Sequence, residues 1–163
     1  MSSYQLAQLN IAELKAPLDS PQLKDFVDNL DRINALAEAS PGFVWRLKGD
    51  GNDATSLRPL ADNIIVNMST WRDVESLKDY VYKSAHVEIL KRKREWFARM
   101  AIPYVLWWVP AGHTPTVGEA VARLERLREH GASAEAFHFG EVHAAPDAEG
   151  AGTARSFPDA CPA

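Results

Sequence analysis

Cysteine is almost absent from the sequence, and the single cysteine, Cys161, lies in a Pro/Ala-rich segment near the end. One cysteine excludes a disulfide framework and a cysteine-based zinc site within one chain. Long apolar runs are also missing, because no window approaches the roughly 18 apolar residues that a membrane span needs. The first residues have no basic leader before an apolar stretch, so we expect no signal peptide. We therefore expect a cytoplasmic protein without a membrane partner.

The sequence has no excess of positive charge. Its 18 Lys and Arg residues are outnumbered by 22 Asp and Glu residues, and a net charge of −4 argues against a nucleic-acid partner. The G-x-S-x-G, P-loop and dinucleotide signatures are absent as well. The five histidines show no helical H-x-x-x-H or E-x-x-H spacing, so we expect no metal site. The candidate chemistry is therefore free of cofactors.

What the sequence contains is typical of one globular domain. It has 163 residues, of which 46% are hydrophobic and 25% charged. A domain of about 140 residues buries roughly two thirds of its unfolded surface, so it needs no metal or disulfide. From residue 144 onward the chain has almost no large apolar residue. We expect a folded domain over 1–143 and a disordered tail over 144–163.

The hydrophobic periodicity predicts an α+β fold. Strands are predicted at 4–12, 42–48, 63–70 and 104–109, with a last short strand at 136–142, and helices at 21–39, 73–83, 86–99 and 117–130. The order is βαββαβ with an extra helix and strand, which is typical of a ferredoxin-like antiparallel sheet with helices on one face. An uncovered apolar sheet face is unfavourable in water. We therefore expect two chains to pack sheet to sheet as a homodimeric α/β barrel, with a cavity in each half.

Tyr80 and His86 are the candidate catalytic pair. Six residues on an uninterrupted helix differ by about 240° in direction, so both side chains can face one cavity only if the helix breaks. We expect that break at Lys83–Ser84, with Ser84 capping the next helix. An imidazole with an ordinary pKa near about 6.5 can accept a proton at neutral pH, and a tyrosine hydroxyl can bind a substrate oxygen. The alternative is that His86 only caps the helix junction.

Polar residues inside apolar strands are candidates for binding a substrate. Gln8 and Asn10 share one strand face, as do Asn67 and Ser69 on another strand. Buried polar groups must be paired, so these side chains either form a network in a cavity or satisfy backbone groups at strand ends. We expect them to line the cavity.

Arginines and tryptophans supply further candidate binding residues. Arg46 and Arg94 could hold a substrate carboxylate, although the basic run at 91–94 is typical of a solvated helix face. Trp71, Trp96 and Trp108 could form a flat apolar pocket for an aromatic ligand. The alternative for these aromatic residues is packing in the core and at a dimer interface.

Several motifs resemble known families. LAQLN (6–10), GFVWRL (42–47), SAH (84–86), REWF (94–97), LWWVPAGHTPT (106–116) and EAFHF (135–139) resemble an uncharacterised bacterial domain family over about 4–143. That family belongs to the dimeric α/β-barrel superfamily, which includes monooxygenases, isomerases, cyclases and stress-responsive proteins. ESLKDYVYKSAHV (75–87) is also similar to a helix of olivetolic acid cyclase. This local resemblance implies that Tyr80 orients a linear polyketide and that His86 deprotonates it for ring closure.

The leading hypothesis is a small-molecule enzyme that uses cofactor-independent acid/base chemistry, of cyclase, isomerase or monooxygenase type. Its substrate would be an apolar carbonyl or phenolic compound. Two alternatives stay open. One is a non-catalytic ligand-binding or stress-response barrel. The other is a haem-binding monooxygenase, because the haem-degrading branch implies an asparagine and a histidine at the places of Asn10 and His86, although that branch's helix tryptophan has no counterpart here.

Overall fold

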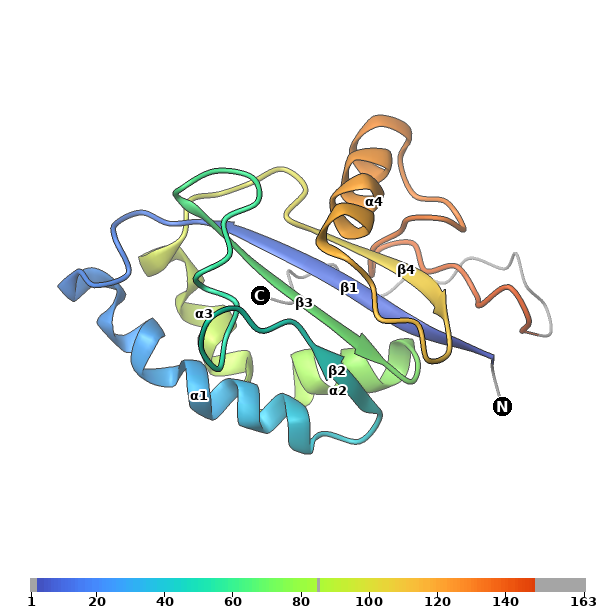
Figure 1. The fold of residues 1–163 in the computed structure, drawn as a ribbon, viewed down its shortest axis with the longest axis horizontal. Coiled ribbons are helices and arrows are strands. Elements are labelled where there is room, and N and C mark those ends of the chain that lie inside the picture. Colours follow the sequence, from blue (N-terminus) through green and yellow to red (C-terminus); the bar gives the residue numbers. More distant parts are fainter. Residues whose placement is uncertain (1–2, 85, 149–163) are drawn as a thin grey trace.

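The computed structural model describes residues 3–84 and 86–148. Four strands and four α-helices follow one another along these residues (Figure 1). Their bounds in chain order are β1 Tyr4–Glu13, the 3-10 helix η1 Pro21–Leu23, α1 Lys24–Ala39, β2 Phe43–Arg46, β3 Ile64–Trp71, α2 Val74–Lys83, α3 His86–Trp96, β4 Tyr104–Pro110 and α4 Val117–His130. The predicted βαββαβ order and the α+β class are confirmed.

The four strands form one antiparallel sheet in the order β2-β3-β1-β4. β1 is central, and its Leu6 lies opposite Trp71 of β3 on one side and Trp108 of β4 on the other. The first and third strands of the motif are thus neighbours, as in a ferredoxin-like fold. Side chains alternate between the two faces of a strand, so this register decides which residues of β1 share each face.

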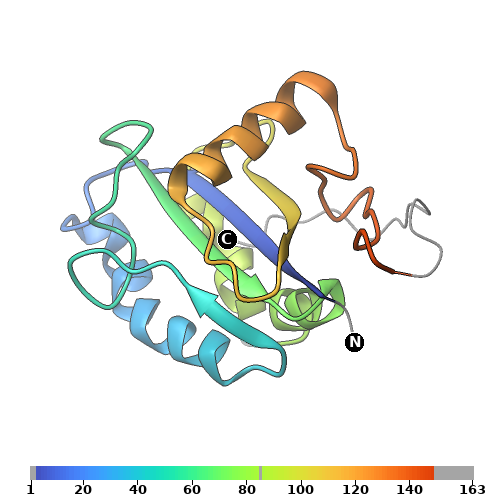
Figure 2. The same cartoon turned by 45° about the vertical axis from the view of Figure 1, so that its right-hand side comes forward.

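Both faces of the sheet are covered by helices of the same chain. α1, α2 and α3 lie on one face and α4 lies on the other (Figures 1 and 2). On the α4 face, Val105 and Trp107 of β4 pack in one core cluster with Ala120 and Leu124 of α4. The predicted uncovered sheet face is therefore wrong. The apolar stripe of α4 buries that face within the chain. The homodimer stays a prediction, but an uncovered sheet face no longer supports it.

The predicted last strand at 136–142 is also wrong among the residues that the structure describes. The segment meets β4 through a single bridge, in which Leu106 and Phe137 exchange two backbone hydrogen bonds of 2.7 and 2.8 Å. Its next amides bond to side chains instead of to a strand. The Phe139 N–H donates to the Tyr104 hydroxyl at 3.0 Å, and the Gly140 N–H donates to Nδ1 of His138 at 2.9 Å. These contacts turn the chain away from the sheet edge.

The boundary predicted at residue 144 is only partly covered by the structure. Ala145 is buried, and the Ser3 N–H donates to a carboxylate oxygen of Asp147 at 2.6 Å. The first residues of the predicted tail thus pack against the start of the chain, and 149–163 lie outside the described residues. Within the described part of the chain, no helix is long and apolar enough to cross a membrane.

Candidate functional site

A break between two helices brings Tyr80 and His86 together. α2 ends at Lys83, Ser84 has an extended backbone, and α3 begins at His86. The Ser84 hydroxyl donates to the Tyr80 carbonyl and accepts from the His86 N–H at 3.1 Å, so Ser84 caps the junction as predicted. The rings of Tyr80 and His86 are 4.9 Å apart between centroids, and only 8% and 2% of these residues are exposed.

Tyr80 is held by contacts on three sides. Its ring stacks on Trp71 with centroids 5.2 Å apart and planes 22° from parallel, and its hydroxyl donates to the Ile33 carbonyl of α1 at 3.2 Å. Burial raises the pKa of Tyr80, and the positive charge of Arg46 opposes this only in part. The phenol therefore stays protonated at neutral pH, where it acts as a hydrogen-bond donor.

A polar network on the sheet lies in the same pocket. Gln8 on β1 lies opposite Ser69 on β3. The Gln8 amide nitrogen donates to Asn67 Oδ1 at 2.7 Å and to Ser69 Oγ at 2.8 Å, and the Trp71 indole also donates to Ser69 Oγ, at 2.9 Å. Gln8 Oε1 is buried and has no hydrogen-bond partner among the residues that the structure describes. Gln8, Asn67 and Ser69 thus form a network in which Gln8 Oε1 accepts no hydrogen bond from the described residues.

Arg46 places a buried charge beside this network. β2 carries it opposite Ser69, and 7% of the residue is exposed. Its Nε donates to Glu38 of α1 at 3.0 Å, and its Nη2 donates to Asn52 at 3.0 Å. The ion pair with Glu38 balances the charge and fixes the end of α1 on the sheet. Arg46 therefore has a carboxylate partner in the protein itself.

Two cavities meet at this site. The smaller, of about 40 Å³, is lined by Gln8, Asn34, Arg46, Asn67, Ser69, Trp71, Tyr80 and His86 together with apolar neighbours. The larger, of about 80 Å³, lies between α1, α3 and the sheet. It shares Ile33, Asn34, Arg46 and Asn67 with the smaller one. Asn10 lines the larger cavity, so Asn10 and His86 are on different sides of the shared residues.

Asn34 and Ile33 are among the lining residues that were not predicted from the sequence. Asn34, which is buried, contributes to both cavities, and Ile33 accepts the hydrogen bond from Tyr80. The sequence signal for Asn34 is a polar residue on the apolar stripe of α1. The role of Ile33 depends on its backbone carbonyl, which no side-chain pattern indicates.

Three of the predicted binding residues lie elsewhere. Arg94 is exposed on α3, and Trp96 is fully buried in a separate core cluster with Leu23 and Phe97. Trp108 packs on Phe137, and its indole donates to the His143 carbonyl at 2.8 Å. The contacts of Trp96 and Trp108 are those of packing residues, whereas Trp71 lines the smaller cavity.

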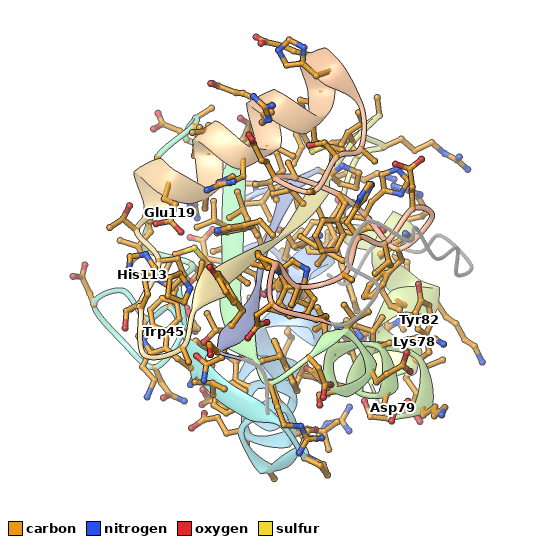
Figure 3. The ribbon with its side chains drawn as sticks, turned by 90° about the vertical axis from the view of Figure 1, so that its right-hand side faces the viewer. Trp45, Lys78, Asp79, Tyr82, His113 and Glu119 are labelled. Carbon is orange, nitrogen blue, oxygen red and sulfur yellow. The ribbon has the colours of Figure 1, made fainter. Side chains whose placement is uncertain are left out.

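The contact between His113 and Glu119 lies away from the pocket. His113 lies 2.8 Å from Glu119, which also accepts a 3.0 Å hydrogen bond from the Trp107 indole. In Figure 3 this pair lies beside Trp45, away from Tyr82 and Asp79 of α2. Within the described residues, no three His, Cys, Asp or Glu side chains are placed to hold a metal ion.

The family model described as "Domain of unknown function (DUF3291)" matches residues 5–153, and the chain belongs to this family. The predicted membership of an uncharacterised family is thereby confirmed. A search of curated proteins gave no match.

Solved structures give distant likenesses. NE2512 of Nitrosomonas europaea, a protein of unknown function, is 14% identical over 70% of this chain and 95% of its own, with a TM-score of 0.45. SnoaB of Streptomyces nogalater, a cofactor-independent oxygenase, is 16% identical over 68% and 95%, with a TM-score of 0.44. PA3566 of Pseudomonas aeruginosa is 15% identical over 69% and 98%, with a TM-score of 0.45. At these values the likenesses carry no argument about activity.

Proposed function

We propose that the chain is a small-molecule enzyme that performs acid/base chemistry without a cofactor on an apolar carbonyl or phenolic compound. The observation that carries the proposal is the packing of the buried His86 imidazole against the buried Tyr80 ring beside the smaller cavity. Histidine and tyrosine side chains beside a cavity are among the groups that act as general acids and bases. The local resemblance of 75–87 to olivetolic acid cyclase also supports it, and makes ring closure the first reaction to test.

In this mechanism His86 accepts a proton from an acidic C–H or O–H of the substrate. The products of that step are an imidazolium and a substrate enolate or phenolate, so charge and protons balance. Tyr80 remains protonated and orients the substrate oxygen by a hydrogen bond, for which it would exchange its bond to Ile33. The amides of Gln8 and Asn67 would bind the polar end of the substrate.

The test compares variants in turnover assays on a panel of linear polyketones and phenols, with products detected by mass spectrometry. We expect His86→Ala to lower kcat by about 10²- to 10⁴-fold, the usual contribution of a general base. His113→Ala is the matched control, because His113 is partly exposed and pairs with Glu119 away from the pocket. Unchanged turnover in both His86→Ala and Tyr80→Phe would sink the mechanism.

A second candidate function is ligand binding without catalysis. One observation favours it: the Tyr80 hydroxyl already donates to the Ile33 carbonyl, which is a structural role. Under this alternative the protein binds members of the panel in calorimetry but converts none of them. Conversion of any bound compound at a rate that falls in His86→Ala excludes it.

A further inference from the structure

We infer that the substrate is an amphiphile whose hydroxyl-bearing head occupies the His86 cavity and whose apolar group occupies the larger cavity between α1, α3 and the sheet. That the ligand is a substrate rests on the proposed function, whereas the inference about its shape rests on the two adjoining cavities. The two recognition elements are Gln8 and the apolar wall of the larger cavity.

The two cavities adjoin each other. Four residues line both, and they lie on three different elements: Ile33 and Asn34 on α1, Arg46 on β2 and Asn67 on β3. A ligand that enters one cavity therefore contacts the wall of the other. A molecule confined to the smaller cavity of about 40 Å³ would leave the larger one unfilled.

The two cavities differ in chemical character. The larger cavity adds mainly apolar side chains, including Phe26, Leu30, Ile65, Ile89 and Phe97. Its additional polar lining residues are Asn10, Asn29, Asp53, Thr55 and Lys93. The smaller one contains the polar network of Gln8, Asn67 and Ser69. Apolar walls gain free energy from apolar ligand surface in proportion to the area buried. The arrangement therefore fits a ligand with one polar and one apolar end.

The polar end of the ligand would meet Gln8. Gln8 is 2% exposed, and both hydrogen bonds of its amide nitrogen go to protein acceptors. Gln8 lines the smaller cavity, and its buried Oε1 has no hydrogen-bond partner among the described residues. A buried acceptor without a donor is unfavourable, and a ligand hydroxyl removes that penalty. Gln8 is thus the specificity-determining acceptor for a hydroxyl on the head of the ligand.

The experiment measures binding by calorimetry with 4-ethylphenol, 4-butylphenol, 4-hexylphenol and 4-hexylanisole. We expect affinity for the phenols to rise about tenfold for each added pair of methylenes until the larger cavity is filled. 4-Hexylanisole, which lacks the donor, should bind about tenfold more weakly than 4-hexylphenol. Equal affinity along the phenol series, or equal affinity for the phenol and the anisole, overturns the inference.

Two variants separate the two recognition elements. Leu30 is half-buried at the wall of the larger cavity, so Leu30→Trp should abolish the gain in affinity with chain length. Gln8→Leu should abolish the preference for phenol over anisole and keep the dependence on chain length. The wild-type series decides the matter even if a variant does not fold. Binding that follows this pattern without turnover would contradict the proposed function alone, and His86-dependent turnover without the pattern would contradict this inference alone.

Discussion

At the scale of single residues, Tyr80 combines an aromatic role with a polar one. Its ring lies between the Trp71 indole and the His86 imidazole, while its hydroxyl reaches the Ile33 carbonyl on another helix. The sequence indicated the pair with His86, because the SAH segment interrupts a helical pattern. It could not indicate Ile33, since the contact depends on how α1 docks on α2. Local spacing predicts local geometry, and long-range docking supplies the rest.

The raised pKa of Tyr80 predicts a pH dependence of stability. The folded chain keeps a phenolic proton that the unfolded chain releases above about pH 10, so Tyr80 stabilises the fold below that pH and ceases to do so as the pH rises further. This group alone should lower the free energy of unfolding by about 1.4 kcal/mol per pH unit above about pH 10. Urea titrations of wild type and Tyr80→Phe at pH 8 to 11 measure it.

The two proteins should therefore converge in alkali. Near neutral pH the wild type should be more stable by about 1 kcal/mol, the usual value of one hydrogen bond. That advantage should shrink as the pH rises. Parallel curves across the whole range would show that the Tyr80 proton is not retained by burial.

At the scale of elements, two helix caps form a matched pair. Asp73 caps α2 by accepting from the Ser76 N–H at 2.8 Å, and Thr116 caps α4 by accepting from the Glu119 N–H at 3.1 Å. Partial burial opposes ionisation of Asp73, but hydrogen bonds from Ser76 and Arg72 outweigh it and lower its pKa. The cap on α2 is therefore charged and that on α4 is neutral.

Removing either cap should cost about 1 kcal/mol of unfolding free energy at neutral pH. The two losses should differ in their pH dependence. An aspartate with a lowered pKa stabilises the fold above its unfolded pKa, near 3.8, and that contribution disappears as the pH falls through the folded pKa. The effect of Asp73→Ala should thus fade in acid, whereas that of Thr116→Ala should persist. Denaturant titrations at pH 7 and pH 3 distinguish the two, and an Asp73→Ala loss that is equal at both would contradict the charged cap.

Elements were predicted from the sequence better than their contacts. The capping box at Thr116 gave the start of α4, but its apolar stripe does not say which sheet face it covers. The alternation in AFHFGEV resembles a strand, yet the hydroxyl of Tyr104 and the ring of His138 bond to the amides that a strand would pair. The first error, and the part of the second that involves Tyr104, arose where side chains distant in sequence decide the structure.

At the scale of the whole molecule, α4 is an integral layer of the fold. Leu124 is 1% exposed and packs in the cluster that contains Trp107. Leu124→Ala should lower the unfolding free energy by about 2–5 kcal/mol, the range for a buried leucine truncated in a core. Leu60, which is 38% exposed, provides the control. Leu60→Ala should change the unfolding free energy by less than about 0.5 kcal/mol.

Urea unfolding monitored by tryptophan fluorescence gives both values, and similar small losses in the two variants would mean that α4 is dispensable for the fold. The oligomeric state is a separate question, answered by sedimentation equilibrium of the intact chain. An open sheet face no longer supports the predicted homodimer, because the chain buries that face itself.

The alternation of β1 has a consequence for how this family can diverge. Ala7, Leu9 and Ile11 point to the α4 layer, whereas Gln8 and Asn10 point to the cavities. A shift of one position would exchange every core side chain for a pocket side chain. An insertion or deletion in this strand should therefore destabilise the fold. New ligand preferences should arise by substitution at alternate positions. In β1, only the positions that face the cavities can change ligand specificity without disturbing the core.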